Sequence, residues 1–208
     1  MEFQYITTGQ PIPPCELVIL PGSKNVRDDL RWLMSNGWPD FLQKHLRYGG
    51  KLLGICGDFQ MLGKYIDDPH GIEGEPGQST ALGYFDMHTT LQPVKQLHQK
   101  TGRLWLNNSA VSGYEIHAGI SEGPALNNAA IITQENKDGA VSSDNQVAGS
   151  YLHGLFDEKK ACDAFLEWAG LDAPESQDYI ALREAEIDRL AVCVEEYLDV
   201  TELMKLMY

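Results

Sequence analysis

The chain has 208 residues, of which 43% are apolar and 22% are charged, and its formal net charge is −14. This length is enough to bury a sizeable core in one large domain, or in a domain with an appended piece. A negative field of this size repels phosphate backbones and anionic lipid. We therefore expect no nucleic-acid partner and no membrane partner.

Cysteine usage favours a reducing compartment. The four cysteines are scattered and include no CxxC pair, which argues against a disulfide framework and against a zinc site. The first residues show neither the basic region nor the apolar segment of a secretory signal. We therefore predict a cytoplasmic protein with no metal site.

Strand-like and helix-like segments alternate in the first quarter of the chain. Residues 16–20 form a short apolar run, which is typical of a strand buried on both faces. Helical spacing follows over residues 25–35 and again over 39–48, before a second apolar run at 51–55. This alternation predicts a parallel sheet with right-handed helical crossovers.

The middle of the chain has a different pattern. Residues 67–83 are rich in Gly, Pro and Asp and predict a long loop. The next strand-like runs have no helices between them, which predicts antiparallel or mixed additions to the sheet. These runs are residues 83–91, 103–106, 114–118 and 129–133.

The last quarter is expected to be mostly helical. A strand over residues 149–154 ends in a turn, and helical spacing follows over 160–169 and 179–207. Apolar residues recur along the second of these helices, and we expect their stripe to pack in the core. The stripe consists of Ile180, Leu182, Ile187, Leu190, Val194 and Leu198.

Cys56 lies where a predicted strand meets a predicted helix, in the stretch Gly54-Ile55-Cys56-Gly57. Small neighbours permit the sharp turn of a nucleophile elbow, which projects a side chain from the sheet edge. The first N–H groups of the following helix point at the sulfur and favour the thiolate. Cys56 is therefore a candidate nucleophile, and a buried structural cysteine is the alternative.

A nucleophilic cysteine needs a base, and His153 is the best placed of the six histidines. It follows a predicted strand, and strand ends in an open α/β sheet line one edge. Gly22 ends another strand there, so the N–H groups of Gly22 and Gly57 are candidate donors to an oxyanion. A buried structural histidine and an ordinary glycine turn are the alternatives.

Taken together, these segments resemble a class I glutamine amidotransferase domain, and most closely the C-terminal domain of cobyric acid synthases. The matching stretches occur in family order, and Ser112-Gly113-Tyr114-Glu115-Ile116-His117 is the most specific of them. The others are residues 20–25, 54–63, 66–69, 71–74 and 151–156. The resemblance implies a flavodoxin-like α/β fold, in which helices flank a central, mostly parallel sheet with added antiparallel strands.

The resemblance also implies hydrolysis of glutamine to glutamate and ammonia through a cysteine thioester. Cys56 would attack the side-chain amide, while Gly22 and Gly57 hold the oxyanion and His153 transfers the protons.

Two further positions are implied to bind the glutamine substrate. Gln60 matches a family position that contacts glutamine, and Tyr114 lies in a segment expected to line the same pocket.

The family passes its ammonia to a synthetase domain that uses ATP and Mg²⁺ to activate corrinoid side-chain carboxylates. No phosphate loop occurs in this sequence. We therefore expect residues 1–208 to form a single glutaminase domain without a cofactor of its own, and an N-terminal synthetase domain to precede it in the full-length protein. The expected role is amidation of cobyrinic acid a,c-diamide in cobalamin (vitamin B12) biosynthesis.

The sequence departs from the family pattern at two positions. Leu155 stands where many amidotransferases carry the third acid of a triad, so Asp157 and Glu115 become candidates for orienting His153. Asp58 replaces a second glycine after the nucleophile, and we expect its charge to turn away from the sulfur and stabilise the helix start.

Three other functions remain alternatives. The chain is an amidotransferase domain for another acceptor, such as cobyrinic acid itself, or a DJ-1-type cysteine hydrolase, or a non-catalytic binding domain. Gln60 and the segment from Ser112 to His117 argue against the hydrolase.

Overall fold

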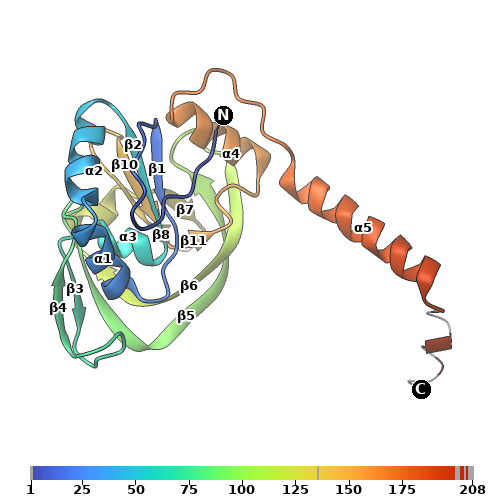
Figure 1. Cartoon of the computed structure of the whole chain (residues 1–208), viewed down its shortest axis with the longest axis horizontal. Coiled ribbons are helices and arrows are strands. Elements are labelled where there is room, and N and C mark those ends of the chain that lie inside the picture. The colour runs from blue at the N-terminus through green and yellow to red at the C-terminus, as the bar shows by residue number, and fades with distance from the viewer. Residues whose placement is uncertain (1, 135, 200–201, 204, 206–208) are drawn as a thin grey trace.

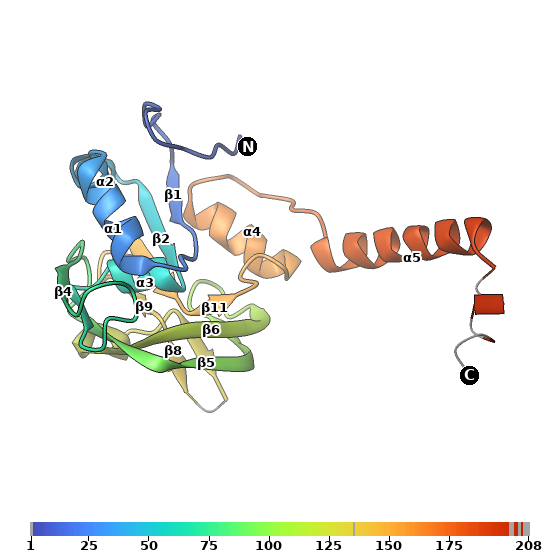
Figure 2. The same cartoon turned by 60° about the horizontal axis from the view of Figure 1, so that its bottom comes forward.

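A computed structural model describes residues 2–134, 136–199, 202–203 and 205 of the chain. Two sheets lie against one another and form the body of the protein, with helices packed around the first sheet (Figure 1). A long C-terminal helix projects away from this body in both views (Figure 2).

The first sheet has the strand order β1 (Leu17–Leu20), β2 (Lys51–Ile55), β10 (Val147–Ser150) and β9 (Ala140–Val141). The strands β1 and β10 run parallel to β2, whereas β9 is antiparallel to β10. Two helices, α1 (Val26–Ser35) and α2 (Trp38–Arg47), connect β1 to β2. The predicted parallel sheet with helical crossovers is therefore confirmed.

The strand β2 shows why this sheet needs unbroken apolar runs. Leu52 packs in the core cluster shared with α1 and α2, whereas Leu53 packs in a second cluster with α4 (Lys159–Trp168). Successive side chains of a strand point to opposite faces. Because helices cover both faces, both positions are apolar and buried.

The second sheet is mainly antiparallel, as predicted for the middle of the chain. Its main path is β11 (Leu152–His153), β6 (Ala110–Glu122), β5 (His88–Leu104), β3 (Tyr65–Asp68) and β4 (Gly77–Thr80). Two short strands, β7 (Ile131–Thr133) and β8 (Lys137–Asp138), extend it beside β5. A short helix, α3 (Gly57–Met61), packs between the sheets, and a 3₁₀ turn, η1 (Pro124–Asn127), follows β6.

Three boundaries differ from the sequence predictions. The hairpin of β5 and β6 continues through residues 92–102, whose exposed, mostly polar side chains gave no strand pattern. The predicted loop over residues 67–83 contains all of β4 and the end of β3. The predicted strand at 149–154 is two strands, because the chain passes from the first sheet to the second between Ser150 and Leu152.

The helix α5 (Tyr179–Tyr197) contradicts the expectation of a buried stripe. None of its residues is buried, and Ile187 and Leu190 are 53% and 64% exposed. Its apolar residues, Leu182 and Val192 included, are spread around the helix, and α4 already closes the nearby core. Most of the remaining predicted helix, from residue 200 onward, lies outside the described residues.

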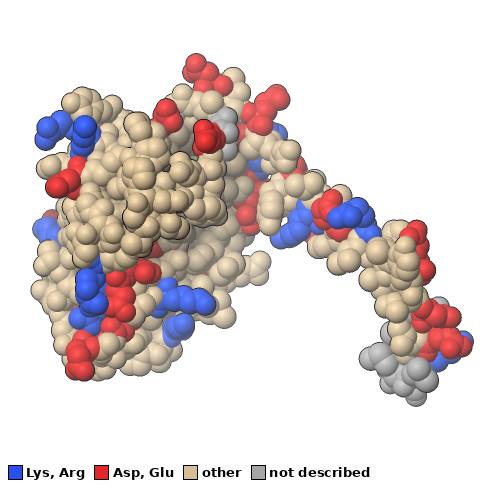
Figure 3. Space-filling model, viewed as in Figure 1, with Lys and Arg blue, Asp and Glu red and all other residues tan. Residues whose placement is uncertain are grey.

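None of the described helices is both long and apolar enough to cross a membrane. In Figure 3, acidic and basic side chains are intermixed along α5, and much of the body shown there carries neither.

Two leucine-to-alanine substitutions test the placement of α5. We expect Leu190→Ala to change the free energy of unfolding by less than about 0.5 kcal/mol, because Leu190 is exposed. Leu42→Ala in α2 is the matched variant. It should lower the free energy of unfolding by about 2–5 kcal/mol, because Leu42 is fully buried. Urea unfolding measures both values, and equal losses would contradict the structure.

Candidate active site

The backbone at Cys56 makes the sharp turn expected of a nucleophile elbow. Cys56 follows β2 and directly precedes α3, with φ = 56° and ψ = −114°. A side-chain-bearing residue rarely adopts such a conformation, which costs on the order of 1–3 kcal/mol. The surrounding structure therefore has to impose it.

Two glycines allow the surrounding structure to impose this turn. A Cβ on Gly54 would lie 2.8 Å from Leu62 Cδ1 and 2.9 Å from the Asp58 carbonyl oxygen. A Cβ on Gly57 would lie 2.8 Å from Val26 Cγ2. Any larger residue at either position would push β2, α3 and α1 apart, so both glycines are steric requirements of the elbow.

Gly22, Cys56 and His153 meet at one end of the first sheet. A Cβ on Gly22 would lie 3.2 Å from His153 Cε1 and 3.5 Å from Cys56 Cβ. Parallel pairing of β1 with β2 aligns Leu20 with Gly54, which brings the two strand ends together. Gly57 adjoins Cys56, so the structure brings four of the sequence-predicted residues into one place.

The Cys56 sulfur is a protonated thiol in the resting structure. Burial raises the pKa of Cys56 to about 11, and the nearby charges of Asp58 and Asp138 add to the rise. A hydrogen bond from the Gly57 N–H lowers this pKa, but by less than burial raises it. The N–H donor at the helix start favours the thiolate, as expected, but burial outweighs it and keeps the sulfur protonated at neutral pH.

His153 is suited to accept the Cys56 proton. Burial lowers the pKa of His153, which keeps the imidazole neutral at neutral pH. Its Nε2 atom is buried and has no hydrogen-bond partner within the described part of the chain. The Cys56 Sγ instead donates to the Ile116 carbonyl oxygen, at 3.2 Å. For proton transfer, the Cys56 thiol therefore has to leave the Ile116 carbonyl oxygen and donate its hydrogen bond to His153 Nε2 instead.

Tyr114 and Gln60 flank the meeting point in different ways. Tyr114 is half exposed and stacks on His153, with ring centroids 5.0 Å apart and planes 10° apart. Gln60 is 1% exposed, and its Oε1 atom has no partner among the described residues. A buried amide oxygen without a partner is costly, so Gln60 carries an unsatisfied acceptor on the helix that follows Cys56.

The two candidates for orienting His153, Asp157 and Glu115, form no hydrogen bond with it in the described part of the chain. Glu115 instead pairs with Lys100, with 2.7 Å between Nζ and Oε2, and lies 4.0 Å from His117 Nε2.

Asp58 differs from its expected role. Its side chain is 6% exposed, and burial raises the pKa of Asp58 to about 8, with the Asp29 charge adding to the rise. At neutral pH it is therefore mostly protonated and carries little charge to stabilise a helix start.

Sequence analysis missed a second buried acid beside the site. Asp138 in β8 is 7% exposed and accepts hydrogen bonds from Ser150 and from the Tyr151 N–H. The sequence pattern assigns no role to this segment, because an Asp-Gly pair is typical of an exposed turn and does not indicate burial. Among the described residues, no group of three His, Cys, Asp or Glu side chains forms a candidate metal site.

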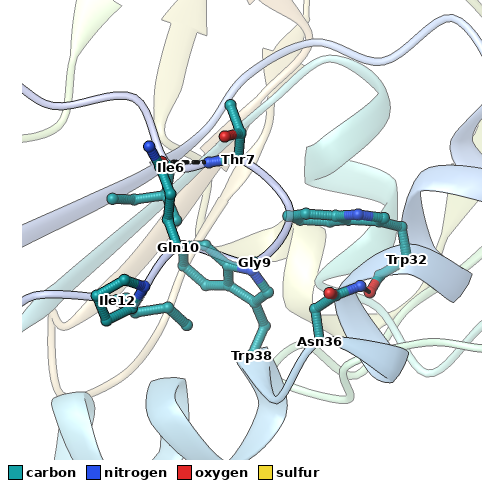
Figure 4. A pocket seen from close by; sticks show the side chains of 9 residues that line it. Ile6, Thr7, Gly9, Gln10, Ile12, Trp32, Asn36 and Trp38 are labelled. Atoms are coloured by element: carbon teal, nitrogen blue, oxygen red, sulfur yellow. Dashed lines mark hydrogen bonds between the residues drawn. The ribbon is translucent and has the colours of Figure 1, made fainter.

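A separate cavity of about 400 Å³ lies between the N-terminal segment and the first two helices (Figure 4). Trp32 and Trp38 form part of its wall, and Trp32 Nε1 donates to Thr8 Oγ1 at 2.9 Å. None of the residues predicted for catalysis or glutamine binding lines it, so this cavity is not the candidate active site.

Comparisons with known proteins agree with this geometry. Residues 1–161 match the family model of the CobB/CobQ-like glutamine amidotransferase domain. A structure described as "Crystal structure of glutamine amidotransferase" is 17% identical with a TM-score of 0.53, over 75% of this chain and 80% of that one. "Structure of PurLQS from Thermotoga maritima" is 15% identical with a TM-score of 0.56, over 79% and 85%. These likenesses support the fold, and the class I amidotransferase fold is confirmed.

The protonation state of Cys56 can be measured by alkylation. With a pKa near 11, about 0.1% of the thiol is ionised at pH 8. We expect the iodoacetamide rate at Cys56, read by mass spectrometry, to rise about tenfold per pH unit up to pH 10. Cys56→Ser supplies the background from the other cysteines. A rate that levels off below pH 8 would show a resting thiolate instead.

Substitution of Asp58 should give a pH-dependent gain in stability. Because folding raises the pKa of Asp58 from 3.8 to about 8, the folded state binds the extra proton and wild-type stability falls as pH rises through that window. Asp58→Asn removes this pH dependence. The free energy of unfolding of the variant, relative to that of the wild type, should therefore rise by about 1 kcal/mol per pH unit between pH 4 and pH 8. Urea unfolding at pH 5 and pH 8 measures it. The exposed Asp40→Asn is the control, and the same pH trend in both variants would exclude burial of Asp58 as the cause.

Proposed function

Because the chain belongs to the CobB/CobQ-like glutamine amidotransferase domain family, we propose that it hydrolyses glutamine at Cys56 and supplies the ammonia to an ATP-dependent synthetase. The observation that carries the proposal is the approach of Gly22 to both Cys56 and His153 at a strained elbow. A structural cysteine has no need of that backbone conformation, nor of a neutral histidine beside it.

The first half-reaction forms a thioester. His153 Nε2 takes the Cys56 proton, and the sulfur attacks the side-chain carbonyl carbon of glutamine. The N–H groups of Gly22 and Gly57 stabilise the resulting oxyanion. Collapse of the tetrahedral intermediate breaks the C–N bond, and His153 returns the proton to the leaving ammonia.

The second half-reaction releases glutamate. His153 takes a proton from water, and the hydroxide attacks the thioester carbon. The same two N–H groups hold the second oxyanion, and the C–S bond then breaks with return of the proton to Cys56. No metal or redox group is required by either half-reaction.

Gln60 and Tyr114 are proposed to bind the substrate. The unpartnered Oε1 atom of Gln60 is an acceptor that suits the ammonium group of glutamine. Tyr114 stacks on His153 and half of its surface is exposed, so it forms a wall against which the substrate can pack.

The acceptor is proposed to be a corrinoid. The segment Ser112 to His117 resembles cobyric acid synthases, and it lies on β6 with Ile116 in contact with the nucleophile. On this basis the chain serves as the glutaminase half of a cobyric acid synthase. Its synthetase half would use ATP and Mg²⁺ to activate the carboxylates of cobyrinic acid a,c-diamide in cobalamin biosynthesis.

Glutamate release from glutamine tests the proposed chemistry. We expect Cys56→Ala to lower kcat by about 10⁴-fold or more, because no other group supplies the nucleophile. Cys193→Ala removes an exposed thiol on α5 and should leave the rate unchanged. A diazo-ketone analogue of glutamine should label Cys56 in the same protein, as read by peptide mass spectrometry.

Different results would support the alternatives. Failure of the analogue to label Cys56, together with turnover of other small substrates, would favour a cysteine hydrolase. No glutamate release even with a cobyric acid synthetase domain added would favour a binding domain. Ammonia transfer to cobyrinic acid rather than to its a,c-diamide would change the acceptor but not the glutaminase. Corrinoid amidation by this chain alone would contradict the proposal that a separate synthetase domain performs the amidation.

A further inference from the structure

The chain passes between the two sheets beside the candidate nucleophile. Ser150 ends β10 in the first sheet, and Leu152 begins β11 in the second. The Cys56 N–H donates to the Ser150 carbonyl oxygen at 2.8 Å, and His153 follows Ser150 by three residues. This crossing segment, residues 150–152, therefore joins the backbone of the nucleophile to the backbone of the base.

Asp138 holds the crossing segment with both of its carboxyl oxygens. The Ser150 hydroxyl donates to Oδ2, and the Tyr151 N–H donates to Oδ1 at 3.2 Å. The Leu152 N–H in turn donates to Ser150 Oγ at 2.9 Å. Asp138 and the three residues of the segment are all buried. A chain leaving one sheet for another loses its ladder partners, and these bonds replace them.

The backbone around Asp138 fits closely against β10. Gly139 has φ = 72°, and a Cβ there would lie 2.0 Å from the Gly149 carbonyl oxygen. The absence of a side chain at Gly139 therefore lets the backbone beside Asp138 approach β10 closely, which brings the carboxyl group within hydrogen-bond reach of the crossing segment.

The Tyr151 side chain fixes the same segment from the other direction. Its ring stacks on His117 with centroids 3.7 Å apart and meets the Phe59 ring edge-on at 5.2 Å. Its hydroxyl is 2.6 Å from Ser121 Oγ. These contacts hold the side chain of Tyr151, and Asp138 holds its N–H group. Together they restrict rotation of the backbone that leads into His153.

We propose that Asp138 is a positioning residue for the Cys56–His153 pair, acting through Ser150 and the Tyr151 N–H. The role rests on the proposed glutaminase function. It goes beyond that function because it names an acid that acts through the backbone. The usual third acid of the triad is missing here, since Leu155 occupies its position. Asp138 touches neither substrate nor the reacting atoms. Because a displacement of about 1 Å at a reacting centre costs about 100-fold in rate, a carboxyl group that sets this backbone has a large effect on kcat.

The experiment compares Asp138→Ala, Asp138→Asn and Ser150→Ala. Glutamate release gives kcat and KM, and kcat is divided by the fraction of sites that the diazo-ketone analogue labels. We expect kcat per labelled site to fall about 100-fold in Asp138→Ala and about tenfold in Ser150→Ala, with KM within about twofold. Asparagine keeps the acceptor for Tyr151 but not the one for the Ser150 hydroxyl, so Asp138→Asn should match Ser150→Ala. The double variant Asp138→Asn/Ser150→Ala should be no worse than either.

Asp68→Asn provides the matched control for lost stability. Asp68 is also fully buried, accepts two backbone N–H groups, from Ile72 and Glu73, and pairs with Arg27. Its substitution should lower the melting temperature and the labelled fraction while kcat per labelled site stays unchanged. If Asp138→Ala behaves in the same way, its role is structural only and the proposal is overturned.

Alkylation of Cys56 separates failure of this proposal from failure of the proposed function. If His153 is positioned to take the thiol proton, His153→Ala slows the iodoacetamide reaction, and Asp138→Ala should slow it to the same extent with no further loss in the double variant. A wild-type chain that releases no glutamate but shows this coupling keeps the positioning role and loses the glutaminase function. Wild-type alkylation rates in Asp138→Ala, with the His153 dependence intact, would reject the positioning role whatever the turnover.

Discussion

The arrangement of the site depends on the positive φ of Cys56 at the end of β2. This turn ends a strand buried on both faces and starts α3 within one residue. It exists because Gly54 and Gly57 let Leu62 and Val26 approach to distances that no side chain would tolerate. The packing of the core therefore holds the strained residue, and its cost of about 1–3 kcal/mol is offset by the burial around it.

The chemistry of the site follows from burial more than from charge. Burial raises the pKa of Cys56 to about 11 and that of Asp58 to about 8, and it lowers the pKa of His153. The resting site is therefore largely neutral: a thiol, a carboxylic acid and an imidazole. A neutral acid–base pair keeps the population of the reactive thiolate low in the resting site.

Two sheets meet at this site, and each contributes something the other lacks. The first sheet supplies the strand ends near Gly22 and Cys56, because β1 and β2 run parallel and end at the same edge. The antiparallel sheet supplies Tyr114 and His153, which are paired across β6 and β11. The crossing segment between Ser150 and Leu152 carries one chain from the first sheet to the second, and so His153 reaches a cysteine almost one hundred residues earlier.

The parallel sheet, the glycine-flanked elbow and the candidates Cys56, His153 and Gly22 could be predicted from the sequence, because short apolar runs and glycines at turns are local signals. The protonation of Cys56, the exposure of α5 and the role of Asp138 could be derived only from the three-dimensional packing. These depend on which surfaces are covered. Apolar residues are core in α4 and exposed in α5, and an Asp-Gly pair marks a surface turn unless another strand packs over it. Local pattern fixes conformation, whereas burial, which sets pKa values and hydrogen-bond strength, is decided by residues distant in the chain.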